Sequence, residues 1–211
     1  FSNVPCKRGS VGIVRNWAKV SLWLLRVICG TRYELRGLEN LPREGFIVAG
    51  KHQSLWETFA LLPLLHNPAY VIKRQLLYVP IWGWWAWKAA MIYVDRGKGG
   101  TALRNMVDGA KRELARGRPV LVFPEGTRRT PGAPTDYKPG VAFLYRQAKA
   151  PVVPFALNSG FYWPRRRFLR HPGTIIVEFL PAIPPGLPAA EFLAALEGRI
   201  EAAVDRLIVE T

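Results

Sequence analysis

The 211-residue sequence is poor in the residues that build metal centres and disulfide frameworks. Its two cysteines, Cys6 and Cys29, show no metal-binding spacing, and its three histidines, His52, His66 and His171, are scattered along the chain. Zinc sites and disulfide frameworks need closer clusters of such residues. We therefore expect a protein of a reducing, cytoplasmic environment that holds no metal, no disulfide and no other bound cofactor.

Acidic residues are also scarce, with 15 Asp and Glu against 30 Lys and Arg, which gives a formal net charge of +15. An excess this large indicates an anionic partner, which is a nucleic acid, a membrane surface or a phosphorylated substrate. Eight tryptophans accompany the basic residues. Because Trp with Lys and Arg is typical of membrane–water interfaces, the composition favours a lipid partner. A basic nucleic-acid-binding protein stays open on these grounds alone.

The segment 11–28 predicts a helix whose apolar residues cover most of its circumference, but it is not free of charge. At 100° per residue, Arg15, Lys19 and Arg26 fall within roughly 60° of one another and form one cationic stripe. Three charges in eighteen residues suit a helix lying in the lipid headgroup region better than one crossing the bilayer. A helix buried against the domain is the alternative. Since the sequence begins with Phe1 rather than Met, we also expect that a membrane anchor precedes it.

Short β-like runs alternate with helical patterns along the rest of the chain. Apolar residues make up 49% of the sequence, which excludes disorder, and the length suits one domain. Such alternation predicts an α/β domain over 31–211 with a mixed, largely parallel sheet flanked by helices, preceded by an amphipathic membrane-interface helix within 1–30. We expect strands at 31–36, 45–50, 69–73, 90–95, 119–123, 152–157 and 174–180, and helices at about 54–66, 75–88, 100–116, 138–148 and 188–208.

A histidine and a glutamate follow the strand expected at 45–50, at the strand end where α/β sheets usually carry their sites. Two helical residues five positions apart point about 140° away from each other, so a contact needs His52 in the turn and Glu57 in the first helical turn. The carboxylate would then hold one imidazole nitrogen and leave the other free as a base. The alternative is a capping box, in which Ser54 and Glu57 close the start of the helix.

Two further polar clusters also follow apolar strands. Arg96 stands before a glycine-rich turn and suits an oxyanion, or it pairs with Asp95 to close the turn. In the other cluster, Gly126 permits an unusual backbone geometry and Arg128 offers a planar fork that binds phosphate well. Glu125 would orient one of these arginines or accept a hydrogen bond from an acceptor hydroxyl. The full phosphate-loop pattern of nucleotide-binding proteins is absent.

Four blocks of the sequence, in this order, resemble those of the glycerolipid acyltransferases. They are His52-Gln53-Ser54-Leu55-Trp56-Glu57, Tyr93-Val94-Asp95-Arg96, Phe123-Pro124-Glu125-Gly126-Thr127-Arg128 and Val153-Pro154. The likeness runs from about residue 31 to 181 and is strongest to the bacterial 1-acyl-glycerol-3-phosphate acyltransferases. Each block alone is a weak signal, but four in order at expected strand ends are a strong one.

The resemblance implies a glycerol-3-phosphate acyltransferase-like fold in which His52 is the general base and Glu57 its partner. It implies transfer of a fatty acyl group from acyl-CoA or acyl carrier protein to the sn-2 hydroxyl of 1-acyl-glycerol-3-phosphate, which gives phosphatidic acid without a metal or a covalent intermediate. The acceptor-binding residues that it implies are Lys73, Arg96, Glu125, Gly126, Thr127 and Arg128. Two residues depart from the family pattern: Glu57 replaces the usual Asp, and Gln75 replaces a frequent Glu.

Substrates of this kind imply docking on a bilayer, and we expect the protein at the cytoplasmic face of the bacterial inner membrane. We interpret a tryptophan cluster as membrane interface or acyl groove, with ordinary core packing as the alternative; it comprises Trp56, Trp82, Trp84, Trp85 and Trp87. The basic run at 165–167, with Arg170, would bind anionic lipid or the phosphates of coenzyme A, or form a solvated loop. The oligomeric state stays open.

Three rival functions remain at this point. The first is transfer of the acyl group to another lysolipid, such as a lyso-ornithine lipid or lysophosphatidylglycerol. The second is nucleic-acid binding, which lacks the aromatic RNA-recognition motif and any helix-turn-helix pattern, so we expect no nucleic-acid partner. The third is a hydrolase that uses Ser54, which lacks the Gly-x-Ser-x-Gly elbow.

Overall fold

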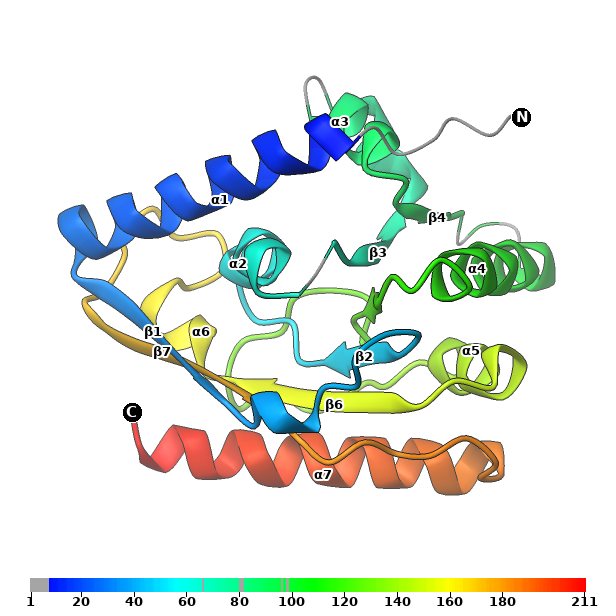
Figure 1. Cartoon of the computed structure of the whole chain (residues 1–211). Coiled ribbons are helices and arrows are strands. Elements are labelled where there is room, and N and C mark those ends of the chain that lie inside the picture. The colour runs from blue at the N-terminus through cyan, green and yellow to red at the C-terminus, as the bar shows by residue number, and fades with distance from the viewer. Residues whose placement is uncertain (1–7, 66, 80–81, 96, 98) are drawn as a thin grey trace.

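In the computed structural model, residues 8–65, 67–79, 82–95, 97 and 99–211 are described, with the backbone alone for 8–11, Trp82 and Trp85. One seven-stranded sheet runs through the molecule in the order β1-β7-β6-β2-β5-β3-β4 (Figure 1). Its strands are β1 (Thr31–Arg36), β2 (Ile47–Gly50), β3 (Ala69–Lys73), β4 (Ile92–Val94), β5 (Val120–Val122), β6 (Val152–Leu157) and β7 (Gly173–Phe179).

The sheet is mixed in the way the sequence predicts. Only β6 and β7 pair antiparallel; all other neighbouring strands pair parallel. β1 and β7 therefore run against the other five strands. The parallel connections carry helices, as crossovers between parallel strands require, and the prediction of an α/β domain with a largely parallel sheet is confirmed.

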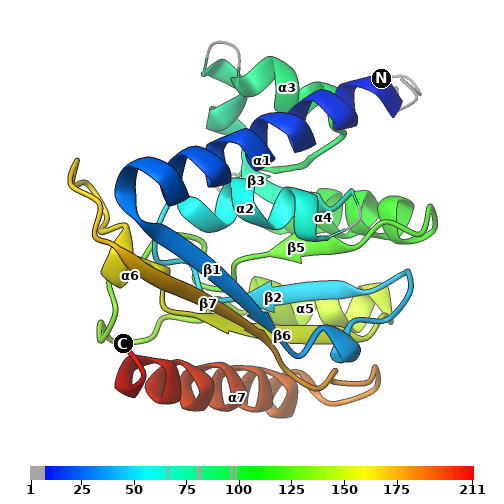
Figure 2. The ribbon, with the colours of Figure 1, turned by 60° about the vertical axis from the view of Figure 1, so that its left-hand side comes forward.

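Helices cover both faces of the sheet because its central strands are apolar on both faces. In β2, Ile47 and Ala49 pack on one side and Val48 packs on the other. Helices α1 (Arg8–Cys29) and α2 (Trp56–Leu64) lie over the Val48 side. Helices α4 (Gly99–Leu114), α5 (Gly140–Ala148) and α7 (Ala189–Val209) lie over the opposite side. Figures 1 and 2 show these two helical layers with the sheet between them.

One expected helix was wrong. In place of a single helix at 75–88, the chain forms a 3-10 helix η2 (Arg74–Tyr78) and a separate helix α3 (Trp82–Lys88). Pro80 stands between them in the sequence, and proline has no amide hydrogen for a helical hydrogen bond. Two short elements were not expected: the 3-10 helix η1 (Leu38–Asn40) and helix α6 (Ser159–Tyr162).

Helix α1 has a buried face and an exposed apolar face. Its packing on the domain is seen, and its position in a lipid headgroup region stays a prediction. Ala18 and Leu22 are buried in the core shared with α2. The large apolar residues that point to solvent are Ile13, Trp17, Val20, Trp23, Leu24, Val27 and Ile28, which we call the α1 apolar face. At 100° per residue, the stripe of Arg15, Lys19 and Arg26 falls between the two faces. Among the described helices, none has the length and apolar character needed to cross a membrane.

Candidate active site

The site lies at the carboxyl end of β2. Beside this strand, the connections between successive strands reverse their direction across the sheet. The chain passes from β2 to β3 across β5, and later from β5 to β6 across β2. Ligands of α/β sheets usually bind at such switch points. Gly50 ends the strand, and a Cβ there would lie 2.3 Å from the carbonyl oxygen of Phe155, so only glycine fits. His52 follows in the turn, and its carbonyl accepts a hydrogen bond from the amide of Arg129 at 2.8 Å.

Glu57 is the most heavily bonded side chain of this turn. It is 0% exposed, and five donors reach its two oxygens. Oε1 accepts from His52 Nδ1 at 2.9 Å and from the amides of Gln53 and Ser54 at 2.7 Å each. Oε2 accepts from the hydroxyl of Ser54 at 2.7 Å and from that of Ser159 at 2.8 Å. The contact between His52 and Glu57 and the capping interaction of Ser54 thus coexist, because one carboxylate serves both.

These bonds decide the charge of Glu57. Burial alone raises the pKa of a carboxyl, but the hydrogen bond and charge of His52, and the bonds from Ser54, outweigh it and lower the pKa of Glu57 below its ordinary value. An ionised Glu57 can only accept, so Nδ1 carries the hydrogen of this bond, while Nε2 makes no hydrogen bond to a described residue. The imidazole is also stacked on Phe123, with ring centroids 4.0 Å apart, so its orientation is fixed on two sides.

The hydroxyl of Ser54 is engaged in two hydrogen bonds of this turn. It donates to Glu57 and accepts from the amide of Trp56 at 2.9 Å, and the residue is fully buried. A nucleophilic serine needs a base within reach and access to the substrate. The fully buried Ser54 lacks that access, so the structure gives no support to the hydrolase hypothesis.

A second buried carboxylate lies in the next turn and differs from the first. Glu125 follows β5, and its Oε1 accepts a hydrogen bond from Lys51 Nζ at 3.3 Å. The same ammonium donates to Glu201 of α7 at 2.6 Å, and the hydroxyl of Tyr137 donates to Glu201 at 2.7 Å. Burial and the nearby charge of Glu201 raise the pKa of Glu125, against the opposing effects of Lys51 and Arg129. Its other oxygen, Oε2, is buried and has no hydrogen-bond partner.

Unpartnered polar atoms gather around these two turns. In the described part of the chain, six buried side-chain polar atoms lack a hydrogen-bond partner, and four of them belong to Gln53, Glu125, Arg129 and Arg165. Buried polar groups are nearly always paired in native proteins, so each exception asks for an explanation. A cluster beside a histidine with a free nitrogen is what a polar substrate would complete.

The other acceptor-binding residues inferred from the sequence are only partly gathered here. Gly126 adopts a left-handed backbone, with φ of 63°, in the turn that also carries Thr127. Arg128 is half-buried, its carbonyl accepts a bond from Arg165 at 2.9 Å, and its guanidinium bonds to no described residue. Lys73 ends β3 with an exposed side chain. Arg96 lies outside the described residues, so its role stays a prediction.

The tryptophans divide into two groups. Trp56 is 1% exposed and packs in the core against Tyr33, so its indole cannot lie in a lipid headgroup layer. Its interpretation as a membrane-interface residue was wrong, while lining of an acyl groove stays a prediction. Trp84 and Trp87 of α3 are about half-exposed. The side chains of Trp82 and Trp85 lie outside the described part of the structure.

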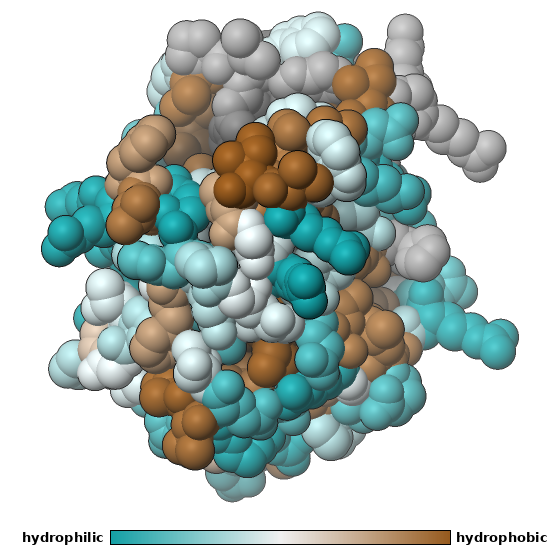
Figure 3. All heavy atoms as spheres, turned by 90° about the vertical axis from the view of Figure 1, so that its left-hand side faces the viewer, coloured by the Kyte–Doolittle hydropathy of each residue, from teal (hydrophilic) through white to brown (hydrophobic). Residues whose placement is uncertain are grey.

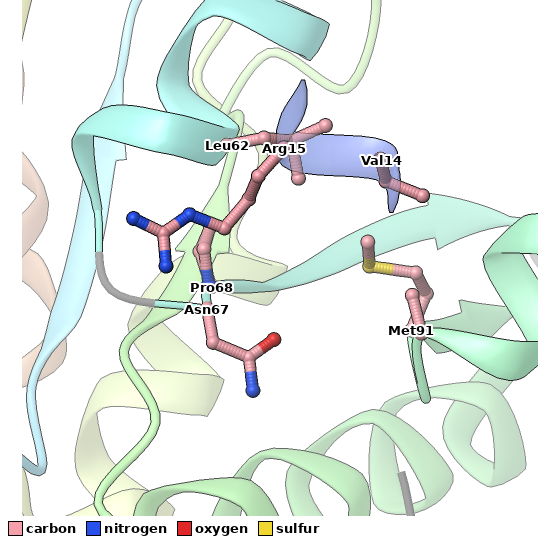
Figure 4. Close-up of a pocket in the computed structure, with 7 residues that line it drawn as sticks. Val14, Arg15, Leu62, Asn67, Pro68 and Met91 are labelled. Carbon is pink, nitrogen blue, oxygen red and sulfur yellow. The ribbon is translucent and has the colours of Figure 1, made fainter. Parts of the chain in front are cut away.

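A small cavity lies under α1 rather than at His52. Figure 4 shows its lining side chains from α1 (Val14 and Arg15), from α2 (Leu62) and from the segments before β3 and β4 (Asn67, Pro68 and Met91). With about 20 Å³ of open space it holds roughly one water molecule. It is too small for an acyl chain.

Several residues of the site were not identified from the sequence. Ser159 and Gln53 join α6 to the His52 turn, because the amide of Gly160 also donates to the side-chain oxygen of Gln53 at 3.0 Å. Lys51, Tyr137 and Glu201 form the second network. Lys51 stands directly before His52, which was the one sequence signal for it.

Known proteins match this chain in sequence and in fold. The family model described as Acyltransferase matches residues 32–158. The 1-acyl-sn-glycerol-3-phosphate acyltransferase of Pseudomonas aeruginosa is 39% identical over 198 residues, which cover 94% of this chain and 77% of the relative. The 1-acyl-sn-glycerol-3-phosphate acyltransferase alpha of Mus musculus is 32% identical, over 81% of this chain and 62% of the relative. The crystal structure of the acyltransferase PlsC from Thermotoga maritima has a similar fold, with a TM-score of 0.78 at 23% identity, over 93% of this chain and 79% of that one.

Proposed function

The chain belongs to the Acyltransferase family, and on that premise we propose that it moves a fatty acyl group from a thioester to the free sn-2 hydroxyl of 1-acyl-glycerol-3-phosphate. The products are phosphatidic acid and a free thiol. One observation carries the assignment of roles: His52 Nδ1 is bonded at 2.9 Å to a fully buried carboxylate, which leaves Nε2 available as the proposed base. The relatives' names support the substrate class.

In the proposed reaction, His52 Nε2 takes the proton of the acceptor hydroxyl while its oxygen attacks the thioester carbonyl. The carbon–oxygen bond forms, the carbon–sulfur bond breaks, and the leaving thiolate takes the proton back from His52. A positioned general base contributes roughly 10²–10⁴-fold to such a rate. Holding both substrates in place contributes much of the rest. The proposed mechanism uses no metal and no covalent acyl-enzyme.

The acceptor's phosphate would bind next to Arg128, whose half-buried guanidinium makes no bond to another described residue. Arginine suits this role because its planar fork matches two phosphate oxygens. We propose Arg96 and Lys73 as further phosphate ligands. Glu125 would accept a hydrogen bond from the acceptor through its unpartnered Oε2, in the turn formed with Gly126 and Thr127.

The α1 apolar face supports action at a bilayer, and we propose the cytoplasmic face of a bacterial inner membrane as its location. Seven large apolar side chains on one helix face, beside a stripe of three cations, are what an interfacial helix presents to anionic lipid. The half-exposed Trp84 and Trp87 of α3 would add to the same interface. The donor is proposed as acyl-CoA or acyl carrier protein, and another lysolipid stays the alternative acceptor.

Thiol release from palmitoyl-CoA with lysophosphatidic acid, in detergent, tests the proposal. The wild-type protein should release thiol only when the acceptor is present, and His52→Ala should reduce the rate about a hundredfold or more. His171→Ala is the matched control, because this exposed histidine contributes only backbone hydrogen bonds and should leave the rate unchanged. An unchanged rate in His52→Ala would contradict the mechanism. Acceptor-independent release would point to thioester hydrolysis.

A further inference from the structure

The loop between α6 and β7 carries the most exposed large apolar side chain of the described residues. Phe168 is 97% exposed and its neighbour Leu169 is 65% exposed. Arg166 and Arg167 precede them and are also exposed. We call the segment Pro164–Arg170 the tip loop. Figure 2 shows it in dark yellow to orange, projecting past the carboxyl end of α1.

The tip loop is held in shape by one of its own arginines. Arg170 donates from a single terminal nitrogen to the carbonyls of Arg167, Phe168 and Leu169, at 2.6, 2.7 and 3.1 Å. Its guanidinium also lies over the ring of Trp163 at 4.0 Å. A bare carbonyl is costly to move into an apolar medium, whereas a hydrogen-bonded one is much less so. Because this nitrogen carries two hydrogens, the three carbonyls share them, and the tip presents its apolar side chains on a backbone whose carbonyls are partly hydrogen-bonded.

The tip loop continues the α1 apolar face. The amide of Gly173, just after the loop, donates to the carbonyl of Gly30, just after α1, at 3.2 Å. At the other end of the loop, Trp163 packs edge-on against Phe59 of α2, which packs in the same way against Trp17 of α1, with centroid distances of 5.9 and 5.7 Å. Figure 3 looks onto this end of the molecule, where hydrophobic and hydrophilic side chains lie side by side.

The base of the tip loop is bonded to the candidate active site. Arg165 donates to the carbonyl of Arg128 at 2.9 Å. Helix α6, from which the loop emerges, holds Glu57 through the hydroxyl of Ser159 at 2.8 Å. A contact that fixes the tip against another surface therefore also fixes the position of His52 relative to that surface.

We infer that the tip loop is a second lipid-binding element, which inserts Phe168 and Leu169 at the boundary between headgroups and acyl chains of an anionic bilayer. Arg166 and Arg167 lie against lipid phosphates, and α1 makes the other contact. Two separated contacts set the height and tilt of the site over the bilayer, which one helix alone leaves free to rotate. This inference rests on the proposed action at a membrane and names the residues that orient it.

The arrangement of the arginines in the tip loop favours a lipid surface as its partner over the phosphates of a nucleotide-containing acyl donor. A nucleotide phosphate needs several donors that converge on it. In the tip loop, Arg170 is engaged by three carbonyls and Arg165 by one, while the exposed Arg166 and Arg167 stand beside two apolar side chains that point to solvent. Cations next to exposed apolar residues are the pattern of an interfacial membrane contact.

The test measures partition of the whole protein into vesicles of phosphatidylcholine with about one third phosphatidylglycerol, a strongly anionic surface. Replacing both tip residues, Phe168→Asp with Leu169→Asp, should weaken partition about tenfold or more, because insertion then places charge in an apolar layer. Val209→Asp is the matched control. That residue is 89% exposed, on α7 across the sheet from α1, and its change should have little effect.

A second variant, Arg166→Gln with Arg167→Gln, should weaken partition about fivefold for each arginine on anionic vesicles, and hardly at all on pure phosphatidylcholine. Unchanged partition of the Phe168 and Leu169 variant would overturn the inference. So would an Arg variant that partitions normally but shows a raised KM for palmitoyl-CoA in detergent, because the loop would then bind the donor. Partition needs no turnover, so failure of the inference is separate from failure of the proposed reaction.

Discussion

Two buried carboxylates, Glu57 and Glu125, follow neighbouring strands of one sheet but differ in their hydrogen bonds and in the direction of their pKa shifts. Glu57 receives five hydrogen bonds, and its pKa is lowered although it is fully buried. Glu125 receives one bond from Lys51, keeps one bare oxygen, and its pKa is raised. The first arrangement is complete without a ligand. The second is incomplete, which suits a group whose partner arrives with the substrate.

Glu57→Gln should give the largest combined loss of activity and stability among the changes that compare these two carboxylates. The amide nitrogen of Gln faces donors that the carboxylate accepted, so we expect a loss of about 3 kcal/mol in the free energy of unfolding. Acyl transfer should fall by roughly 10²–10⁴, because His52 loses the group that fixes its tautomer. Urea unfolding and thiol release measure the two effects, with the exposed Glu191→Gln as control.

The pH dependence of stability sharpens the same prediction. A carboxyl whose pKa is lowered by folding stabilises the native state above its ordinary value of 4.5, and this stabilisation is lost as pH falls through the folded pKa. The difference between wild type and Glu57→Gln in unfolding free energy should therefore be largest at neutral pH and shrink in acid. A constant difference would show that folding leaves the pKa of Glu57 unchanged, and a difference that grows in acid would show that folding raises it.

Lys51→Met should come next, through stability. Lys51 is buried, and removing it leaves Glu125 and Glu201 without their shared cation. Breaking such a buried ion pair by removing one partner costs about 3–5 kcal/mol. Lys138→Met is the matched control, because Lys138 pairs with Asp136 at the surface, where the loss should be small. Equal effects of the two variants on urea unfolding would contradict the importance of the buried network.

Glu125→Gln should behave unlike Glu57→Gln and tests the comparison most directly. The amide oxygen can still accept from Lys51, and Oε2 has no bond to lose. Because folding raises the pKa of Glu125, its carboxyl favours the folded state in acid, and this contribution is lost as pH rises through the folded pKa. With that contribution absent and no hydrogen bond lost, Glu125→Gln should change the free energy of unfolding by less than about 1 kcal/mol at neutral pH. The KM for lysophosphatidic acid should rise about tenfold, in line with one lost substrate hydrogen bond. A large loss of stability would mean that Glu125 is structural.

Ser159→Ala should give the smallest effect. It removes one of five donors to Glu57, which leaves four in place and costs about 1 kcal/mol of stability. The rate of thiol release should fall only slightly, because His52 keeps its bond to Oε1 while the serine binds Oε2. A rate as low as that of Glu57→Gln would show that Oε2, and α6 with it, controls the histidine.

The local part of this site could be predicted from the sequence because it depends on residues close in the chain. The five-residue spacing placed His52 in the turn and Glu57 in the helix, and the structure joins them as expected. The strands at 31–36, 69–73 and 152–157 have the predicted bounds, because apolar runs between turn residues identify buried strands.

The remainder depends on contacts between distant residues of ordinary type. Ser159 reaches Glu57 across 102 residues, and Glu201 reaches Lys51 across 150. Serines and glutamates are common on helix surfaces, so no periodicity distinguishes these two. The interpretation of Trp56 as a membrane-interface residue was wrong for a related reason. Tryptophan suits a core and a membrane interface alike, and the burial of Trp56, which is 1% exposed, decides for the core.

The bond between Lys51 and Glu201 also sets an order of events during synthesis. At about 5–20 residues per second, the ribosome needs roughly 8–30 s to add the 150 residues that separate the two partners. Throughout that interval the lysine next to His52 has no Glu201 to bind, so the turn cannot bury its charge in the final arrangement. The turn that carries His52 is thus completed only after α7 has been made, so a nascent chain that lacks α7 does not yet hold the finished site.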